Sequence, residues 1–210
     1  MLQFIQVKKE YGERVILSIP ALTLTDGIYW LSGVNGSGKT TLLKMVSGLI
    51  PFTGHILLGG VNLRQNSVDY RRFVSYAEAE PAYPPFLTGQ ELIRFHHDIR
   101  GASSSQTGQL IERLGFGQFL STPVGTYSSG MIKRLSLLLA FIGHTKLILM
   151  DEPLATLDTE AANVLPQLIE EYHTTYGTSF IFSSHSSFSG EKLIVNQKLL
   201  LRDQVIHLSA

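Results

Sequence analysis

The sequence contains no cysteine among its 210 residues. This excludes disulfide bonds and thiol nucleophiles, and it argues against a structural zinc site, because such sites are built largely on thiolate ligands. The chain also lacks an excess of charge of either sign, since 17 Lys and Arg residues balance 17 Asp and Glu residues. No overall field attracts nucleic acid or an anionic membrane, and we therefore expect no nucleic-acid partner.

Long hydrophobic runs are missing as well. The longest apolar stretch, Leu135 to Ile142, is far shorter than the roughly 20 residues that a membrane-spanning helix needs. The first residues, MLQFIQVKKEYGER, mix charges early and contain neither an apolar h-region nor a cleavage-like site, so no signal peptide is expected. Any role at a membrane is therefore expected to be peripheral.

What remains is the composition of an ordinary globular protein, with 44% hydrophobic and 16% charged residues. Hydrophobic periodicity and turn signals predict β-structure first, then a mainly helical region after Pro81 to Pro85, then a return to alternating strands and helices. Strands are expected at Leu2 to Val7, Val15 to Ile19, Ile28 to Leu31, Leu147 to Met150, Ser179 to Ser183, and around Leu199 and Val205. Helices are expected at Thr40 to Gly48, Glu91 to Ile99, Gln109 to Leu114, Met131 to Phe141, and Thr159 to Tyr172. The predicted layout is an α/β core with a helical insertion.

The segment GVNGSGKT, from Gly33 to Thr40, matches the phosphate-loop pattern G-x-x-x-x-G-K-[ST] in full. Its glycines let successive backbone N–H groups converge on one anion, and the following helix adds the positive end of its dipole. Lys39 is expected to supply a charge for the phosphates, and the Thr40 hydroxyl to ligate Mg²⁺. A chance glycine-rich turn before a lysine is the alternative, but the strand–loop–helix context disfavours it. The residues expected to bind the nucleotide here are Gly33, Val34, Asn35, Gly36, Ser37, Gly38, Lys39, Thr40 and Thr41.

Two acidic residues, Asp151 and Glu152, follow the apolar run LILM. A buried strand delivers such carboxylates to the edge of an α/β sheet that binds ligands. Neighbouring residues at a strand end point in different directions, so Asp151 is expected to hold Mg²⁺ and Glu152 to face the attacking water. These acids also suit the first turn of a helix, and the two readings are compatible.

Together these segments resemble the nucleotide-binding domain of ABC ATPases over nearly the whole chain. The segment LILMDEP resembles the family's Walker B motif, ATLD its D-loop, and TYSSGMIKRLSLLLA its signature region. The resemblance implies an α/β fold of one domain over residues 1–210. It consists of a P-loop NTPase core with a mixed sheet, an N-terminal antiparallel β subdomain and an inserted α-helical subdomain. Residues 1–87 and 143–210 would form the core with its β subdomain, and residues 88–142 the helical subdomain.

The resemblance also implies roles for residues outside the phosphate loop. His185 sits where the family places a switch histidine that hydrogen-bonds the γ-phosphate, and it joins Lys39 and Glu152 as a catalytic residue. Tyr11 sits where an aromatic ring stacks on adenine. Ser128, Gly130 and the D-loop residue Asp158 would complete the nucleotide site, the first two by contacting the ATP of a second subunit. The alternatives are a surface histidine, a hairpin-turn aromatic and a common SSG turn.

The sequence departs from the family at two places. Ser129 replaces the first of the signature's two glycines, so a side chain there either crowds the partner's triphosphate or adds a hydroxyl donor. Ala79 occupies the position of a glutamine that touches the metal and water site. Our hypothesis is that Glu80 takes over this role, with Glu78 as the other candidate and solvated loop acids as the alternative.

The function implied is ATP hydrolysis by a transporter subunit that binds ATP and Mg²⁺ and dimerises with a second ABC ATPase domain, most simply a copy of itself. Because the chain ends near Ala210, soon after the predicted core, a separate membrane permease is expected, with this chain in the cytoplasm on the inner face of the cell membrane. The chain also loosely resembles the compact ATPases of ABC-2-like and haem-export-type systems. The alternatives are a soluble ABC ATPase acting on ribosomes or DNA, a regulatory ATP-binding module with weak hydrolysis, and a small-molecule kinase.

Overall fold

The fold comes from a computed structural model, which describes residues 1–184 and 195–209 of the chain. The first hydrophobic runs pair as an antiparallel sheet of four strands in the order β2-β1-β4-β5. These strands are β1 (Leu2–Tyr11), β2 (Arg14–Leu24), β4 (Thr53–Leu58) and β5 (Val61–Asn62). The side chains of Leu2 and Phe4, two residues apart on β1, are both buried, as expected for a sheet with one face on the core.

A second sheet has six strands in the order β10-β9-β3-β8-β7-β6. Its members are β3 (Ile28–Ser32), β6 (Val74–Ala77), β7 (Leu147–Asp151), β8 (Ser179–Ser183), β9 (Gln197–Arg202) and β10 (Val205–Ser209). β3, β6, β7, β8 and β9 pair in parallel, whereas β10 pairs with β9 in the antiparallel sense. The sheet is therefore mixed, as predicted. Every residue of β7 is buried, because this strand has neighbours on both sides and packing on both faces.

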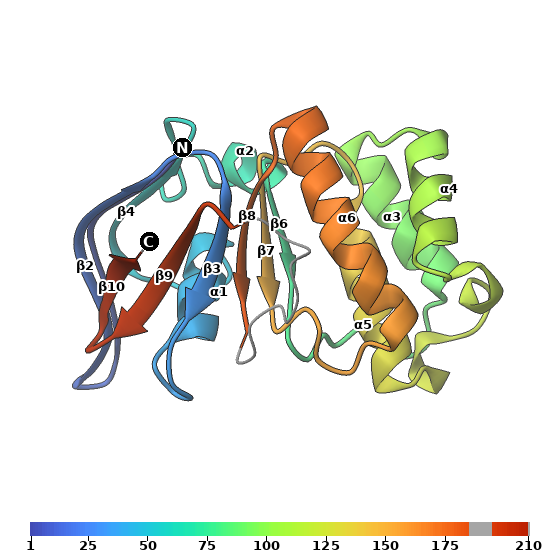
Figure 1. Ribbon diagram of the computed structural model, residues 1–210, viewed down its shortest axis with the longest axis horizontal. Coiled ribbons are helices and arrows are strands. Elements are labelled where there is room, and N and C mark those ends of the chain that lie inside the picture. The colour runs from blue at the N-terminus through green and yellow to red at the C-terminus, as the bar shows by residue number, and fades with distance from the viewer. Residues whose placement is uncertain (185–194, 210) are drawn as a thin grey trace.

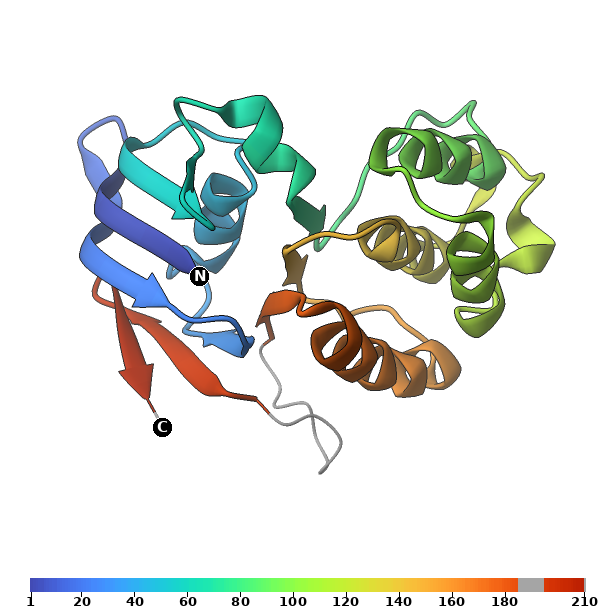
Figure 2. The same ribbon diagram turned by 90° about the horizontal axis from the view of Figure 1, so that it is seen from above.

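The helices divide into two groups. Two of them, α1 and α2, precede β6, whereas α3 to α5 follow one another between β6 and β7 and α6 lies between β7 and β8. The helices are α1 (Lys39–Val46), α2 (Ser67–Arg72), α3 (Gly89–Arg100), α4 (Ser104–Arg113), α5 (Ser129–Phe141) and α6 (Thr159–Tyr176). Figures 1 and 2 show α3 to α6 gathered on one side of the molecule and the antiparallel sheet on the other. Among the described residues, no helix is both long and apolar enough to cross a membrane.

The ends of α3 follow from local sequence. Thr88 and Glu91 form a reciprocal capping box, in which the Thr88 side chain accepts from the Glu91 N–H and the Glu91 carboxylate accepts from the Thr88 N–H. The helix ends at Gly101, whose φ of 59° lies in the left-handed region that favours glycine. Local signals of this kind fix where the inserted helices begin and end.

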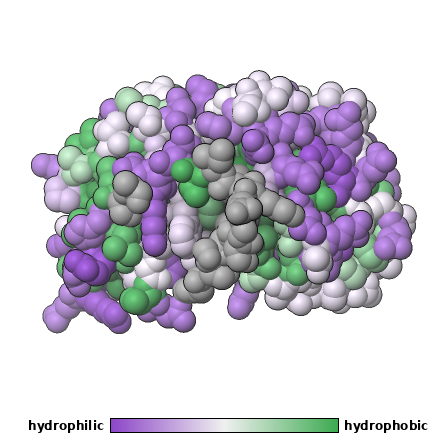
Figure 3. All heavy atoms as spheres, viewed as in Figure 1, coloured by the Kyte–Doolittle hydropathy of each residue, from purple (hydrophilic) through white to green (hydrophobic). Residues whose placement is uncertain are grey.

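The six-stranded sheet separates two hydrophobic cores, because alternate residues of its strands face opposite sides. On β7, Ile148 and Met150 pack with the helices α3 to α6, whereas Leu147 and Leu149 pack with α1 and the antiparallel sheet. The face drawn in Figure 3 is largely hydrophilic, with apolar residues scattered between polar ones. Both cores meet at β7, so the strand that carries the two acidic residues is fixed from both sides.

The predicted elements are all present, and the fold class is confirmed. Of the strands and α-helices in the described residues, β4, β5, α2 and β6 were not predicted, and neither were two 3-10 helices at Gly117–Phe119 and Val124–Thr126. β5 and α2 have two and six residues, so neither is long enough to show a clear period. The exact division of the chain at residues 87 and 143 stays a prediction.

Candidate nucleotide-binding site

The phosphate-loop segment links β3 to α1, as predicted. Gly38 precedes the first turn of α1 with a φ of 107°, a left-handed conformation that residues with a side chain rarely adopt. A Cβ atom at Gly33 would lie 2.6 Å from the carbonyl oxygen of Leu201 on β9. Glycine at these two positions therefore allows the loop to curl above the sheet edge and to lead into the N-terminus of α1.

Lys39, the first residue of α1, turns its side chain back over the loop. Its Nζ atom donates to the carbonyl oxygens of Gly33 at 2.8 Å and of Val34 at 3.2 Å. Burial lowers the pKa of Lys39, and the nearby carboxylates of Glu152 and Asp151 oppose that shift. The ammonium group therefore lies between the loop and the two acids, as expected of a side chain that binds phosphate.

Asp151 ends β7 and is 2% exposed. Its carboxylate is held from the two neighbouring strands. Ser183 of β8 donates its hydroxyl to Oδ1, and Tyr76 of β6 donates its hydroxyl to Oδ2 at 3.4 Å. Burial, together with the charge of Asp151, raises the pKa of Tyr76, so this phenol stays a donor at neutral pH. The orientation of the Asp151 carboxylate is thus fixed by side chains of both adjacent strands.

Glu152 follows with a φ of 45°, in the left-handed region. Its backbone N–H donates to the Ser183 hydroxyl at 3.0 Å, so one serine binds both acidic residues. A non-glycine residue in this conformation is strained, and such strain persists where the surroundings hold it, often at functional sites. The turn at Glu152 directs the chain away from β7 immediately after the sheet edge.

The phosphate loop and the acids line one common cleft of about 520 Å³. The described residues that line it are Arg14, Ile16, Asn35, Gly36, Gly38, Lys39, Thr40, Thr41, Ala79, Asp151 and Glu152. Sequence reasoning predicted most of this set but missed Arg14 and Ile16 of β2, for which the sequence offered no motif. The Thr40 hydroxyl and the Asp151 carboxylate are the oxygen donors that Mg²⁺ prefers. The cleft therefore fits a triphosphate and its magnesium ion.

Tyr11 lies on the β1–β2 hairpin, where it pairs with Arg14 across the strands. Its side chain is exposed, and the Nζ atom of Lys9 lies 4.4 Å from the centroid of its ring. Arg14 is among the residues that line the cleft, whereas Tyr11 is not. Stacking of Tyr11 on adenine stays a prediction.

Ala79 lines the cleft, at the position where the resemblance expects a glutamine. The carboxylate of Glu78 turns instead toward α1, where it lies 3.5 Å from the Nζ atom of Lys44. Glu80 is exposed. Neither glutamate is among the described residues that line the cleft. Replacement of the glutamine by Glu80 stays a prediction that no contact of the described residues supports.

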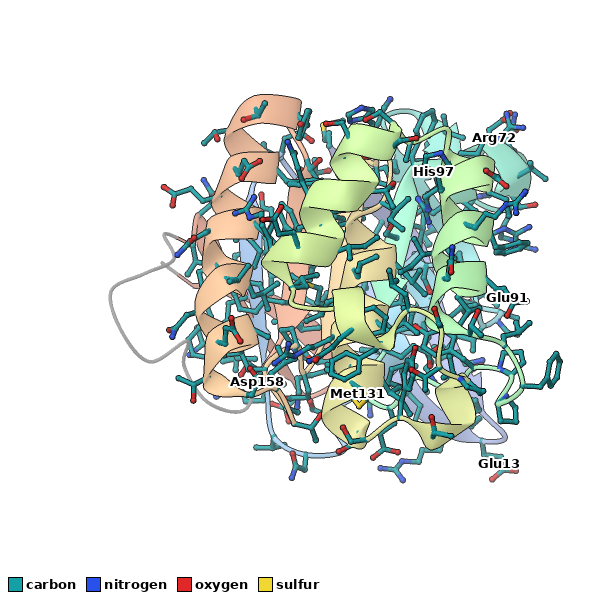
Figure 4. The ribbon with its side chains drawn as sticks, turned by 90° about the vertical axis from the view of Figure 1, so that its right-hand side faces the viewer. Glu13, Arg72, Glu91, His97, Met131 and Asp158 are labelled. Carbon is teal, nitrogen blue, oxygen red and sulfur yellow. The ribbon has the colours of Figure 1, made fainter. Side chains whose placement is uncertain are left out.

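The signature and D-loop residues line a second cleft of about 600 Å³. Ser128, Ser129 and Gly130 lie there with Asp158. Figure 4 places Met131 and Asp158 at the same end of α5 and α6, with Arg72 and His97 near the opposite end. Within one chain, the signature residues and the phosphate loop thus line two different clefts.

Several polar groups that line this second cleft already form hydrogen bonds within the chain. Ser128 caps α5 by accepting from the Met131 N–H. Asp158 caps α6 by accepting from the N–H groups of Glu160 and Ala161, and its other oxygen accepts from the Arg134 guanidinium. These hydrogen bonds lower the pKa of Asp158, with the bond from Arg134 as the largest cause. The expected nucleotide role of Asp158 stays a prediction beside this structural one.

His185 lies outside the described residues. Its predicted role as a switch histidine therefore stays a prediction.

Comparisons with known proteins agree on one family. The model of the ABC transporter family matches residues 21–155. A linearmycin resistance ATP-binding protein of Bacillus subtilis (strain 168) is 28% identical over 88% of this chain, and the match spans 61% of that relative's length. A lantibiotic transport ATP-binding protein of Streptococcus pyogenes is 32% identical over 88% of this chain and 80% of its own length.

A solved structure extends the likeness to the fold. It is a dimeric ATP-binding cassette in a post-hydrolysis state, bound to ADP and Pi. It superposes with a TM-score of 0.84, at 20% identity, over 98% of this chain and 96% of its own. At this identity the likeness establishes the fold and leaves the activity to the residues of the site.

Proposed function

Since this chain belongs to the ABC transporter family, we propose that it binds and hydrolyses MgATP and that this hydrolysis drives transport. Lys39 and the loop amides would hold the phosphates, while Thr40 and Asp151 would hold Mg²⁺. Glu152 would orient the attacking water. When bound, Mg²⁺ would neutralise charge that develops on the transferred phosphoryl group.

The observation that carries the proposal is the cleft shared by Lys39, Thr40, Asp151 and Glu152. Phosphoryl transfer needs little covalent help from the protein, so positioning and charge supply most of the catalysis. A cation, a hydroxyl and two carboxylates come together here from two segments more than a hundred residues apart in the sequence. Their hydrogen bonds hold the cation and one carboxylate in place before any ligand binds.

The test is a turnover assay with a matched binding measurement. Wild-type protein is expected to release phosphate from ATP in the presence of Mg²⁺, and Glu152→Gln is expected to lower the rate by about 10²–10⁴-fold. Because Gln has nearly the same shape, binding of a fluorescent ATP analogue should stay close to that of the wild type. Equal turnover by the wild type and by Glu152→Gln would contradict the proposal.

We also propose that ATP brings two copies of the chain together. The support is the separation of the two clefts, since signature residues that line a different cleft from the phosphate loop suit the nucleotide of a second copy. The dimeric cassette bound to ADP and Pi has the same fold. ATP-dependent dimers of Glu152→Gln, measured by light scattering, would support this arrangement, and a monomer at saturating ATP would count against it.

The membrane partner is proposed to be a permease on a separate chain, with this subunit on the inner face of the cell membrane. The support is that two relatives carry the names of transport or resistance ATP-binding proteins. Co-purification with a co-expressed membrane protein from the same operon would test this, with an unrelated permease as the control.

A regulatory module with weak hydrolysis is the second candidate. Ala79 lines the cleft without the polar side chain that the resemblance expects, and the exposed Ser129 stands in place of a glycine. If the partner-bound protein turns over ATP no faster than Glu152→Gln, this second function replaces the first.

A further inference from the structure

Lys133 lies on α5, five residues after Ser128, and its side chain is buried with 1% exposure. A buried ammonium group is costly unless it is hydrogen-bonded. Its Nζ atom donates to the carbonyl oxygens of Glu78 at 2.7 Å and of Asp151 at 2.8 Å, with Ala79 at 3.4 Å. Each acceptor belongs to the main chain of a segment that lines the nucleotide cleft.

These acceptors come from two different places in the fold. Glu78 and Ala79 follow β6, at the start of the loop that leads into the inserted helices, whereas Asp151 ends β7. Lys133 itself comes from the third inserted helix. One side chain thus joins the helical layer, the loop after β6 and the end of β7.

The next residue, Arg134, makes a different connection. Its guanidinium binds Asp158 and donates to the carbonyl oxygen of Leu114 at 3.1 Å, on the side of the second cleft. Consecutive helix residues project about 100° apart, so two adjacent cations reach two sites. Lys133 therefore connects α5 to the nucleotide cleft, which the phosphate loop and the two acids line. Arg134 connects α5 to the second cleft, which the signature residues line.

Glu78 is held by two lysines from two different helices. Its carboxylate pairs with Lys44 of α1, while its carbonyl accepts from Lys133 of α5. The Lys44 pair is partly exposed and is expected to contribute little. The buried bonds to Lys133 are the stronger restraint on this loop, because a charged donor roughly doubles the strength of a hydrogen bond.

We propose that Lys133 is a positioning residue that holds the loop at Glu78 and Ala79 against the end of β7. It thereby sets the position of Ala79 relative to Asp151 and to the bound nucleotide. Motion of α5 would reach the site through this ammonium group. The catalytic part of this inference rests on the proposed ATPase function. The restraint on the loop does not.

Three variants test the proposal. Lys133→Met keeps the length and burial of the side chain but removes every donor, and Lys133→Arg restores a cationic donor. The matched control is Gln106→Met, because Gln106 also joins the helical layer to core backbone, by donating to Gly143 at 3.2 Å, but outside both clefts. Any general loosening of the helical layer should appear in the control as well.

The first measurement is amide hydrogen exchange of the nucleotide-free protein. Lys133→Met is expected to exchange faster than the wild type at residues 78–82 and unchanged at residues 33–40. Gln106→Met is expected to leave residues 78–82 as in the wild type. Wild-type exchange at residues 78–82 in Lys133→Met would overturn the proposal, whether or not the protein hydrolyses ATP.

The second measurement is steady-state ATP hydrolysis. Lys133→Met is expected to lower kcat by about 10–100-fold with little change in KM, because the phosphate loop itself is untouched. Lys133→Arg should recover part of that loss, and Gln106→Met should turn over at the wild-type rate. Equal losses in Lys133→Met and Gln106→Met would overturn the proposal. Absence of turnover by the wild type would count against the proposed function instead and leave the decision on Lys133 to the exchange data.

Discussion

Ser183 donates its hydroxyl to Oδ1 of Asp151, and the Oγ atom of Ser183 accepts the backbone N–H of Glu152 at 3.0 Å. Ser183 is completely buried, at the end of β8. One small side chain therefore orients both the expected metal ligand and the backbone of the expected catalytic glutamate.

Replacement of Ser183 by alanine is expected to weaken the magnesium site. The Asp151 carboxylate would lose one of the two side-chain donors that the described residues provide, and outer partners of metal ligands typically contribute 10–100-fold to affinity or activity. We expect Ser183→Ala to need about tenfold more Mg²⁺ for half-maximal ATP hydrolysis, measured by titration at fixed ATP.

Ser179→Ala is the control for that titration. Ser179 begins the same strand and accepts the backbone N–H of Gly27 at 3.1 Å, far from the cleft. Its alanine variant should keep the wild-type magnesium dependence. An unchanged midpoint in Ser183→Ala would mean that Tyr76 alone orients Asp151.

Gly130 is expected to be required for folding as well as for any contact with a partner's nucleotide. A Cβ atom there would lie 2.9 Å from the carbonyl oxygen of Thr156, so Gly130→Ala should crowd the D-loop backbone. We expect a loss of about 1–3 kcal/mol in the free energy of unfolding, measured with urea and without nucleotide.

Gly108→Ala provides the comparison for Gly130. It lies within α4, where an added Cβ atom meets no neighbour within 4 Å. Alanine in place of a helical glycine should stabilise the protein by about 0.5–1 kcal/mol. A Gly130→Ala protein as stable as the wild type would confine the role of this glycine to the assembled dimer.

Two substitutions at Asp158 separate its helix-capping role from its ion pair with Arg134. Asn keeps a cap but loses the charge, and because the Asp158 side chain is 46% exposed this should cost less than about 1 kcal/mol. Ala loses the cap as well, which should cost about 1 kcal/mol more. Chemical unfolding of both variants measures these differences.

The same variants test the expected nucleotide role of Asp158. If Asp158 acts only within its own chain, Asp158→Asn in the Glu152→Gln background should still dimerise with ATP. Loss of the dimer in a stably folded Asp158→Asn protein would assign the carboxylate to the interface.

His96 is expected to make the protein less stable in mild acid. Burial, followed by the charge of Arg100, lowers the pKa of His96 to about 4, below the value of about 6.5 in an unfolded chain. Glu78 lines the same small cavity and does not reverse this shift. The folded state therefore binds fewer protons than the unfolded state between these values. The contribution of His96 to the free energy of unfolding is therefore fully present above pH 6.5 and is lost as the pH drops toward 4.

Between pH 7 and pH 5, His96 is expected to lower the free energy of unfolding of the wild type by about 2 kcal/mol. His96→Gln should show a correspondingly smaller loss when urea unfolding is compared at the two pH values. His97→Gln is the control, since His97 bonds Thr107 on the neighbouring helix. An equal loss in the wild type and in His96→Gln would show that His96 does not titrate in this way.

The strands and helices with strong local signals could be predicted from the sequence. β7 was recognised because LILM is a continuous apolar run, and α3 was predicted at Glu91 to Ile99, whereas its start at Gly89 and its cap by Thr88 and Glu91 were seen only in the structure. β4 and β6 were missed although both are partly apolar. Their assignment as strands depends on pairing with β1 and with β7, which lie far away in the sequence.

The candidate site likewise combines features that the sequence predicts with contacts that it does not. The phosphate loop is a contiguous segment whose chemistry depends on residue spacing, so the sequence by itself determined where a phosphate is expected to bind and which acids follow a buried strand. The partners of those acids are 75 residues away for Tyr76 and 32 residues away for Ser183, and Lys133 reaches Glu78 across 55 residues. Only the tertiary structure decided these contacts, because they depend on which strands lie next to β7 and on how α5 packs against the sheet. A lysine on a helix is expected at the surface, and the packing of α5 is what buries this one beside the nucleotide cleft.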